Sequence, residues 1–329
     1  MINAKKYALI DLHLHLDGSM SLECARSLAE KQGIALPDDA ELLTRLRVSD
    51  DCQDLNEYLE RFELPLSLLQ TAESISESVE RLSNELAAEG LIYAEIRFAP
   101  QLHLQKGLTQ EEVVIAAIDG LSRGKLSASL ILCCMRGASN REQNIETVRL
   151  VSKYLGKGVC AVDLAGAEAL FPNENFIDVI EYAKSLSLPM TLHAGEALGS
   201  ESVSSAIELG ADRIGHGVRS IENPELLQIL AQKKIALELC PTSNMNTRVF
   251  ETMSQYPIRA FLEAGMLITI NTDNTSVSAT SLANEYQKIA DTFSLTESEL
   301  QTLALNSAYA TFLCDVEKEK LVERIKSRF

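Results

Sequence analysis

The sequence predicts an α/β protein folded as one (β/α)8 barrel, the TIM barrel, with a helical insertion after the first strand and further helices at its C-terminus. Two patterns predict this fold. Short runs that are apolar on both faces, as in buried parallel strands, occur at 7–14, 91–99, 128–135, 158–165, 189–194, 212–217, 235–241 and 265–273. Amphipathic helical patterns separate them, as at 111–125, 175–187, 202–210 and 223–233. A doubly wound open sheet is the alternative, but eight evenly spaced strand–helix units favour the barrel.

The chain is longer than such a barrel requires. It has 329 residues, against roughly 250 for the fold, and we interpret 1–329 as a single domain. Residues 19–90 separate the first two strands by more than one crossover helix needs. An insertion at that point lies over the active face of a barrel, so 19–90 is predicted to be a helical gate. The tail at 281–329 has helical patterns and is expected to pack against the barrel.

Composition argues against several classes of partner. The formal net charge of -17 disfavours binding to nucleic acid or to an anionic membrane, which leaves a small molecule as the expected partner. The sequence contains neither a long apolar run nor a signal-peptide pattern, so a cytoplasmic protein is expected. The seven cysteines follow no framework spacing and include no CxxC, which is typical of buried thiols. The sequence makes no prediction of the oligomeric state.

Histidines mark the predicted functional face. Of the five in the chain, four fall at the ends of predicted strands: His13, His15, His193 and His216. His103 follows the second strand and is interpreted as an ordinary loop histidine. Because a barrel brings the carboxyl ends of its strands to one face, we expect the four strand-end imidazoles to converge there.

These residues predict a metal centre. Residues i and i+2 of a strand share a face, so His13 and His15 can hold one metal ion, with His193 and Asp273 completing the ligand set. Nitrogen-rich ligation favours zinc. The fourth strand ends in "VDLAGAE", without the lysine that often bridges two metals in related barrels, so one zinc ion is expected. Each part alone has an ordinary interpretation, such as a hydrogen-bonded core histidine or, for Asp273, a turn cap.

Two further residues suit catalysis beside a metal-activated water. Glu196, in "HAGE", can donate a proton if burial raises its pKa. The competing interpretation is a helix-start glutamate that is stabilised by the helix dipole. His216 is predicted to orient the attacking hydroxide and to stabilise the charge that develops on it.

The motifs "HLHLDGS", "CCMR", "DLAGAE", "HAGE", "GHG" and "NTDN" stand in the order, and at the strand ends, of adenosine deaminases. The chain therefore resembles this family of the metal-dependent amidohydrolase superfamily from its first strand to its eighth. The resemblance implies zinc-dependent deamination of adenosine and 2′-deoxyadenosine to inosine and deoxyinosine plus ammonia, within purine salvage or catabolism. It also implies that Glu196 protonates N1 of the purine while His216 and Asp273 orient the hydroxide that adds to C6.

The resemblance further assigns the substrate contacts. The backbone N–H of Gly166 would meet N3, Asp17 would accept a hydrogen bond from the ribose 5′-hydroxyl, and His15 would border the substrate. Asn274 stands where the best-known members carry a second aspartate. Its amide can donate directly to N7, which leaves the fine specificity open. The gate residues, which an ordinary buried helix stripe explains equally well, would be Leu55, Tyr58, Leu59 and Phe62.

Other functions stay in view. Asp17 would repel a 5′-phosphate, so adenosine is favoured over AMP. Adenine, which has no ribose for Asp17, ranks second, and a 5′-modified adenosine such as 5′-deoxyadenosine or aminodeoxyfutalosine is a third possibility. A phosphotriesterase-like or amide-cleaving barrel is disfavoured by the missing lysine and by the presence of Glu196. A barrel that binds nucleoside or metal without turnover has no positive support.

Overall fold

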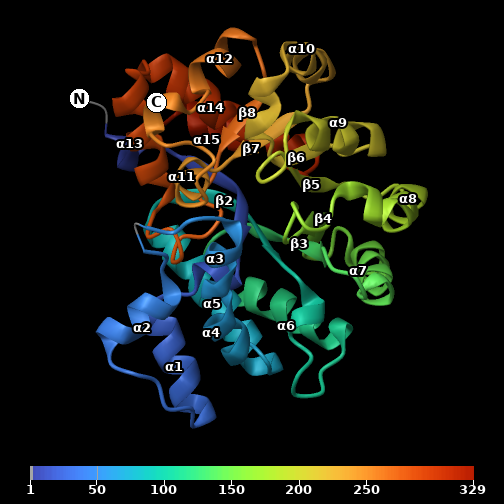
Figure 1. The fold of residues 1–329 in the computed structure, drawn as a ribbon. Coiled ribbons are helices and arrows are strands. Elements are labelled where there is room, and N and C mark those ends of the chain that lie inside the picture. Colours follow the sequence, from blue (N-terminus) through green and yellow to red (C-terminus); the bar gives the residue numbers. More distant parts are fainter. Residues whose placement is uncertain (1–2, 50) are drawn as a thin grey trace.

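Eight parallel strands form the centre of the computed structural model, which describes residues 3–49 and 51–329 (Figure 1). Strands β1–β4 form one four-stranded sheet in sequence order and β5–β8 form the other. Isolated bridges between Leu14 and Asp273 and between Val162 and Met190 join the two sheets at both seams. The predicted barrel is therefore confirmed. The strands are β1 (Leu9–His15), β2 (Leu91–Phe98), β3 (Ala128–Met135), β4 (Val159–Ala165), β5 (Thr191–Ala194), β6 (Arg213–His216), β7 (Ala236–Leu239) and β8 (Ile268–Ile270).

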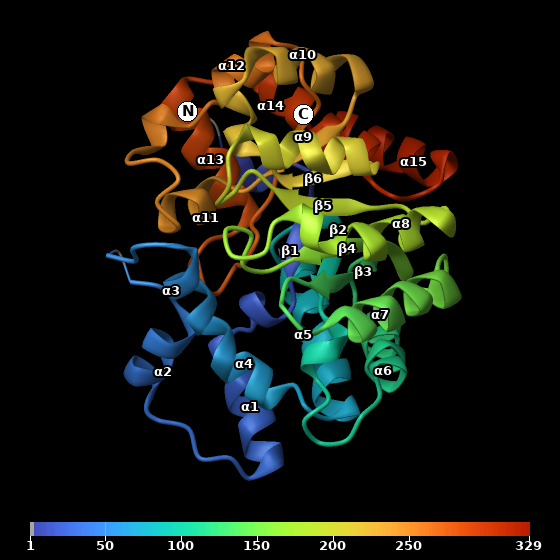
Figure 2. The ribbon, with the colours of Figure 1, turned by 45° about the vertical axis from the view of Figure 1, so that its right-hand side comes forward.

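Helices surround the barrel (Figures 1 and 2). Helix α5 packs against β2 and α6, so it is the crossover between the first two strands, and α14 packs against β8 and β1. The helices are α1 (Leu22–Gln32), α2 (Asp39–Leu46), α3 (Leu55–Leu59), α4 (Glu63–Leu68), α5 (Ala72–Ala88), α6 (Gln110–Arg123), α7 (Arg141–Tyr154), α8 (Ile177–Ser185), α9 (Ser200–Leu209), α10 (Pro224–Lys233), α11 (Pro241–Asn246), α12 (Ile258–Glu263), α13 (Leu282–Phe293), α14 (Glu297–Ala310) and α15 (Asp315–Lys326). Among the described residues, every helix is too short or too polar to cross a bilayer.

The insertion between β1 and β2 has two parts. Helices α1, α2 and α4 project from one side of the barrel, whereas α5 belongs to the barrel's own ring (Figures 1 and 2). Local sequence sets the boundaries. The Asp54 carboxylate accepts hydrogen bonds from the first turn of α3, and Thr71 begins α5 with a reciprocal capping box. The part of the insertion that borders the barrel opening includes α3 and the following 3-10 turn, Glu60–Phe62.

Charged side chains fill part of the barrel interior. The Arg97 guanidinium contacts the Asp163 carboxylate at 2.9 Å and that of Glu238 at 2.8 Å, while Arg213 contacts Glu238 at 2.6 Å and Glu95 at 2.7 Å. All five residues are buried. Buried charges are tolerated only when they are paired and hydrogen-bonded, so this network fixes the strands against one another inside the barrel.

Candidate active site

A cavity of about 310 Å³ opens at the carboxyl ends of the strands. Each residue predicted to contact the substrate or act in catalysis lines it, whereas the predicted ligand His13 lies fully buried beneath. The cavity lining therefore joins residues that lie more than 250 positions apart in the sequence. Its predicted members are His15, Asp17, Leu55, Tyr58, Leu59, Phe62, Gly166, His193, Glu196, His216, Asp273 and Asn274.

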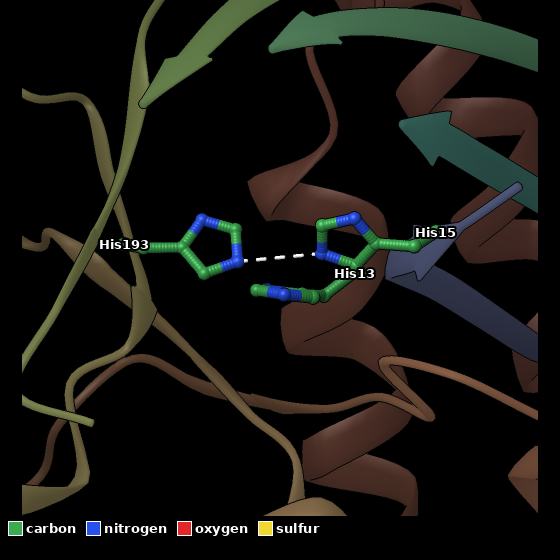
Figure 3. A group of neighbouring side chains, drawn as sticks. All are labelled: His13, His15 and His193. Atoms are coloured by element: carbon green, nitrogen blue, oxygen red, sulfur yellow. Dashed lines mark hydrogen bonds between the residues drawn. The ribbon is translucent and has the colours of Figure 1, made fainter. Parts of the chain in front are cut away.

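Three imidazoles converge at the base of the cavity. Figure 3 shows the rings of His13 and His15, from β1, facing that of His193, from β5. The Nε2 atoms of His15 and His193 are 3.3 Å apart, and one nitrogen of each of the three rings lies within 4.8 Å of the others. The buried Nε2 of His13 has no hydrogen-bond partner. Lone pairs of three imidazoles grouped in this way form a candidate metal site.

Carboxylates behind the rings fix their tautomers. His13 Nδ1 lies 2.8 Å from a Glu238 oxygen, and His193 Nδ1 lies 2.9 Å from an Asp163 oxygen. Each Nδ1–H donates to its carboxylate, so each Nε2 keeps a free lone pair that points toward the shared centre. Metal-binding histidines are held in this way by a second layer of carboxylates, which orients the ring and raises its basicity as a ligand.

Asp273, predicted to end the eighth strand, lies three residues beyond the observed strand. Strand β8 ends at Ile270, and the chain then bends so that Asp273 adopts a φ of 63°. Its backbone bonds with β1: its N–H donates to the His13 carbonyl at 2.7 Å, and its carbonyl accepts from the His15 N–H at 2.8 Å. The Oδ1 atom is consequently 3.4 Å from Nε2 of both histidines. The positive φ of Asp273 thus places its carboxylate beside the rings of His13 and His15.

The ionisation of these groups suits metal binding. Burial lowers the pKa of His15 and of His193, which keeps their rings neutral. Burial alone would raise the pKa of Asp273, but the adjacent His13 ring and the other nearby imidazoles hold it below the usual range. For His13, the neighbouring Asp273 and Glu238 carboxylates outweigh burial and raise the pKa. The site therefore offers the neutral imidazoles of His15 and His193 together with the Asp273 carboxylate.

Glu196 and His216 face each other beside this centre. Glu196 Oε2 is 3.6 Å from His216 Nε2, and both side chains are buried. Burial, together with the charges of Asp273 and Glu168, raises the pKa of Glu196 well above its ordinary value. Asn244 donates to His216 Nδ1 at 3.2 Å, so the neutral ring carries its proton on Nε2, toward the cavity. The pair therefore comprises a carboxyl group that holds its proton more tightly than usual and an oriented N–H donor.

The remaining predicted contacts line the walls. Burial raises the pKa of Asp17 to about 6. A side chain at Gly18 is excluded, because its Cβ would lie 1.7 Å from the Asn274 Oδ1 atom. Gly166 adopts a φ of 107°, a conformation that favours glycine. Its side-chain-free surface is therefore part of the cavity wall.

We call Leu55, Tyr58, Leu59 and Phe62 the roof. They lie on α3 and the turn that follows it. Tyr58 is buried and hydrogen-bonds to Ser278 at 2.8 Å, whereas Leu55, Leu59 and Phe62 stay partly exposed. Apolar contacts of this segment reach Val277 beyond β8. The helical spacing of these four residues fits an ordinary buried stripe as well as a gate. In the structure, their side chains border the cavity.

Sequence reasoning missed several residues of this site. Asp163, Glu238 and Asn244 each bond a histidine ring, and Arg136 lines the cavity while its terminal nitrogens donate to the Phe171 and His193 carbonyls and to Asn173. A signal exists for two of them, because Asp163 and Glu238 are charges inside otherwise apolar strand runs. His103 is buried, and its ring bonds to the Leu69 carbonyl at 2.8 Å, away from the metal site.

The barrel and its histidine–carboxylate centre define the class of protein, a metal-dependent amidohydrolase fold. The family model for adenosine deaminase matches residues 8–328. The chain belongs to the adenosine deaminase family. It is 47% identical to an adenosine deaminase of Haemophilus ducreyi, covering 100% of this chain and 98% of the relative. It is also 42% identical to an adenosine deaminase of Enterococcus faecalis, over 97% and 96% of the two chains.

A solved structure shares the architecture. The adenine deaminase of Arthrobacter aurescens superimposes with a TM-score of 0.87 at 25% identity, over 98% of each chain. That enzyme is named for a free base, whereas the two sequence relatives are named for a nucleoside. The family model and the two sequence relatives support adenosine as the substrate.

Proposed function

We propose that this protein catalyses the hydrolytic, zinc-dependent deamination of adenosine and 2′-deoxyadenosine to inosine and deoxyinosine, with release of ammonia. The observation that carries the proposal is the arrangement at the cavity base. Three imidazoles and the Asp273 carboxylate surround one point, and Glu196 and His216 lie beside it. Water addition to C6 needs an activated nucleophile and a proton donor that can reach the neighbouring ring nitrogen N1, and this arrangement supports both roles.

The donor set fits one zinc ion. Its proposed ligands are His13, His15, His193 and Asp273. The unpartnered, buried Nε2 of His13 supports this assignment, because such an atom otherwise loses a hydrogen bond without compensation. A zinc ion bound here would supply hydroxide at neutral pH by lowering the pKa of water to about 7.

Glu196 is the proposed proton donor. Its raised pKa favours the protonated carboxyl, which is proposed to give its proton to N1 as water adds to C6. His216 is proposed to hold and orient the attacking oxygen through its Nε2–H, together with Asp273. The C6–N6 bond then breaks, ammonia leaves and the inosine product remains, so one water is consumed for each ammonia released.

The cavity walls support a purine nucleoside. The Gly166 N–H is proposed to donate to N3 and the Asn274 amide to N7. Asp17 would bind the ribose 5′-hydroxyl, with His15 bordering the substrate. The roof, within the 19–90 insertion, is the proposed gate that covers the bound substrate and excludes water.

Adenine is the second candidate substrate. The likeness to the Arthrobacter adenine deaminase favours it, and the buried Asp17 argues against it, because adenine would leave this carboxyl without a hydroxyl partner. A 5′-modified adenosine is the third. AMP is disfavoured because the terminal nitrogens of Arg136, the arginine in the cavity lining, already donate to backbone and amide oxygens.

Ultraviolet absorbance with adenosine, adenine and AMP in parallel tests the proposal. We expect the zinc-loaded protein to convert adenosine and to leave the other two unchanged. An Asp17→Asn variant should raise KM for adenosine more than it lowers kcat. Preferential turnover of adenine would overturn the nucleoside assignment, and inactivity toward all three would overturn the proposed reaction.

A further inference from the structure

Glu168 sits behind the loop that carries Glu196. It follows β4, its side chain is only 1% exposed, and it faces the 195–199 loop between β5 and α9. Its two carboxylate oxygens accept hydrogen bonds from five donors. Oε1 accepts from the Gly195 N–H at 2.7 Å and the Ser202 hydroxyl at 2.5 Å, and Oε2 accepts from the N–H groups of Glu196, Ala197 and Leu198 at 3.1, 2.7 and 3.1 Å.

The opposite edge of the same loop is also held. The Gly195 carbonyl accepts from the Arg219 N–H at 3.1 Å, and the Glu196 carbonyl accepts from Arg219 Nε at 3.2 Å. Gly195 has a φ of 71°, and a Cβ there would lie 2.4 Å from a Val203 methyl group. The backbone on both sides of Glu196 is therefore fixed in one conformation, with Glu168 satisfying four successive N–H groups.

We propose that Glu168 is a positioning residue for the reaction: its carboxylate fixes the backbone of the 195–199 loop and thereby aims the Glu196 side chain at the reacting purine beside His216. This inference rests on the proposed role of Glu196 as proton donor. Glu168 is too far behind the loop to line the cavity, so it acts through Glu196 and not on the substrate.

Only a carboxylate fits this position. All five groups that face Glu168 are donors, and an ionised carboxylate offers two oxygens that accept without competing donors. A glutamine of the same shape would turn an NH2 group toward one set of N–H groups. The loop would then have to shift, and proton transfer tolerates little misplacement of the donor.

Glu168→Gln in the zinc-loaded protein is the first test. We expect kcat for adenosine to fall about 100-fold, with KM changed only a few-fold and zinc content retained. Glu174→Gln is the matched control, because Glu174 is an exposed glutamate nearby whose carboxylate accepts from the Ser205 hydroxyl, and its kcat should equal that of the wild type. If Glu168→Gln fails to fold, Glu168→Asp takes its place, since it keeps the charge and retracts it; we expect a smaller fall in kcat.

A double variant separates positioning from general stability. If Glu168 acts through Glu196, adding Glu168→Gln to Glu196→Gln should lower kcat no further. A wild-type kcat in Glu168→Gln, or losses that multiply in the double variant, would overturn the inference while the proposed function stands. A wild type that does not deaminate adenosine would overturn both.

Discussion

The floor and the roof of the cavity are built differently. The floor consists of His13, His15, His193, Glu196, His216 and Asp273, which stand on strand ends, or on the residues just after them, and are held by buried hydrogen bonds and ion pairs. The roof is a five-residue helix and a 3-10 turn, held by apolar contacts and by the bond of Tyr58 to Ser278.

This difference separates two tasks. Groups that transfer protons or bind metal must be placed within fractions of an ångström, and a network such as that of Glu238 with Arg97 and Arg213 achieves this. A segment that admits a substrate has to open, so it belongs to the weakly held parts of a fold. Changes to the floor should therefore affect kcat or stability, and changes to the roof should affect KM.

The largest effect is expected for Glu196→Gln, at the floor. The amide cannot give a proton to N1, so kcat for adenosine should fall by about 10³-fold. Zinc content and the melting temperature should stay close to those of the wild type, since the residue is not a proposed ligand. Steady-state kinetics and elemental analysis check this, and near-full activity would remove Glu196 from the mechanism.

Glu238→Gln comes next and tests how the floor is held. It leaves His13, Arg97 and Arg213 with one carboxylate fewer in a fully buried setting, so the free energy of unfolding should fall by about 3 kcal/mol. Glu41→Gln, which breaks an exposed ion pair with Arg45, is the control and should cost less than about 0.5 kcal/mol. Denaturant unfolding measures both; equal, small losses would mean that the network does not stabilise the floor.

His103 links the insertion to the segment that follows β2 and predicts a pH effect of intermediate size. Its ring bonds to the Leu69 carbonyl, just after α4 of the insertion, and burial lowers its pKa from 6.5 to about 4. The unfolded chain therefore binds a proton between these values that the folded chain does not, so stability falls as the pH drops below 6.5. From pH 7 to pH 5 the free energy of unfolding should fall about 2 kcal/mol more in the wild type than in His103→Gln. Parallel pH dependences would contradict the assignment.

The smallest effect is expected at the roof. Leu59→Ala removes a partly exposed apolar side chain from the cavity border, so KM for adenosine should rise about fivefold, with kcat nearly unchanged. Leu170→Ala is the control, because Leu170 is 63% exposed and lies outside the cavity. A large fall in kcat at Leu59 would show that the roof takes part in placing the reacting groups.

The barrel and the positions of the histidines could be predicted because they depend on local patterns. Each predicted strand run matches an observed strand, and strand ends of a barrel meet at one face whatever the side chains are. The apolar pattern predicts Asp273 at the end of a strand, but the strand stops at Ile270. The positive φ of Asp273 and its hydrogen bonds to β1 arise from tertiary contacts, which the local pattern does not contain. Apolar patterns extend past the point where the backbone leaves the sheet.

The residues behind the site could not be predicted in the same way. Glu238 and Glu168 act through partners that lie 25 or more positions away, so their roles depend on packing rather than on spacing. The function of the roof could not be predicted from its spacing, because apolar residues recur with the same period in a buried helix stripe and along a cavity border. The roles of the site residues in metal binding and catalysis remain predictions.

Removal and return of the metal tests the central claim most directly. The protein is treated with a chelator, and adenosine turnover is measured while zinc is added back in known amounts, with His15→Ala alongside. We predict that the metal-free protein is inactive, that full activity returns at one zinc ion per chain, and that His15→Ala regains little. Full turnover by the metal-free protein, or full recovery in His15→Ala, would contradict the account.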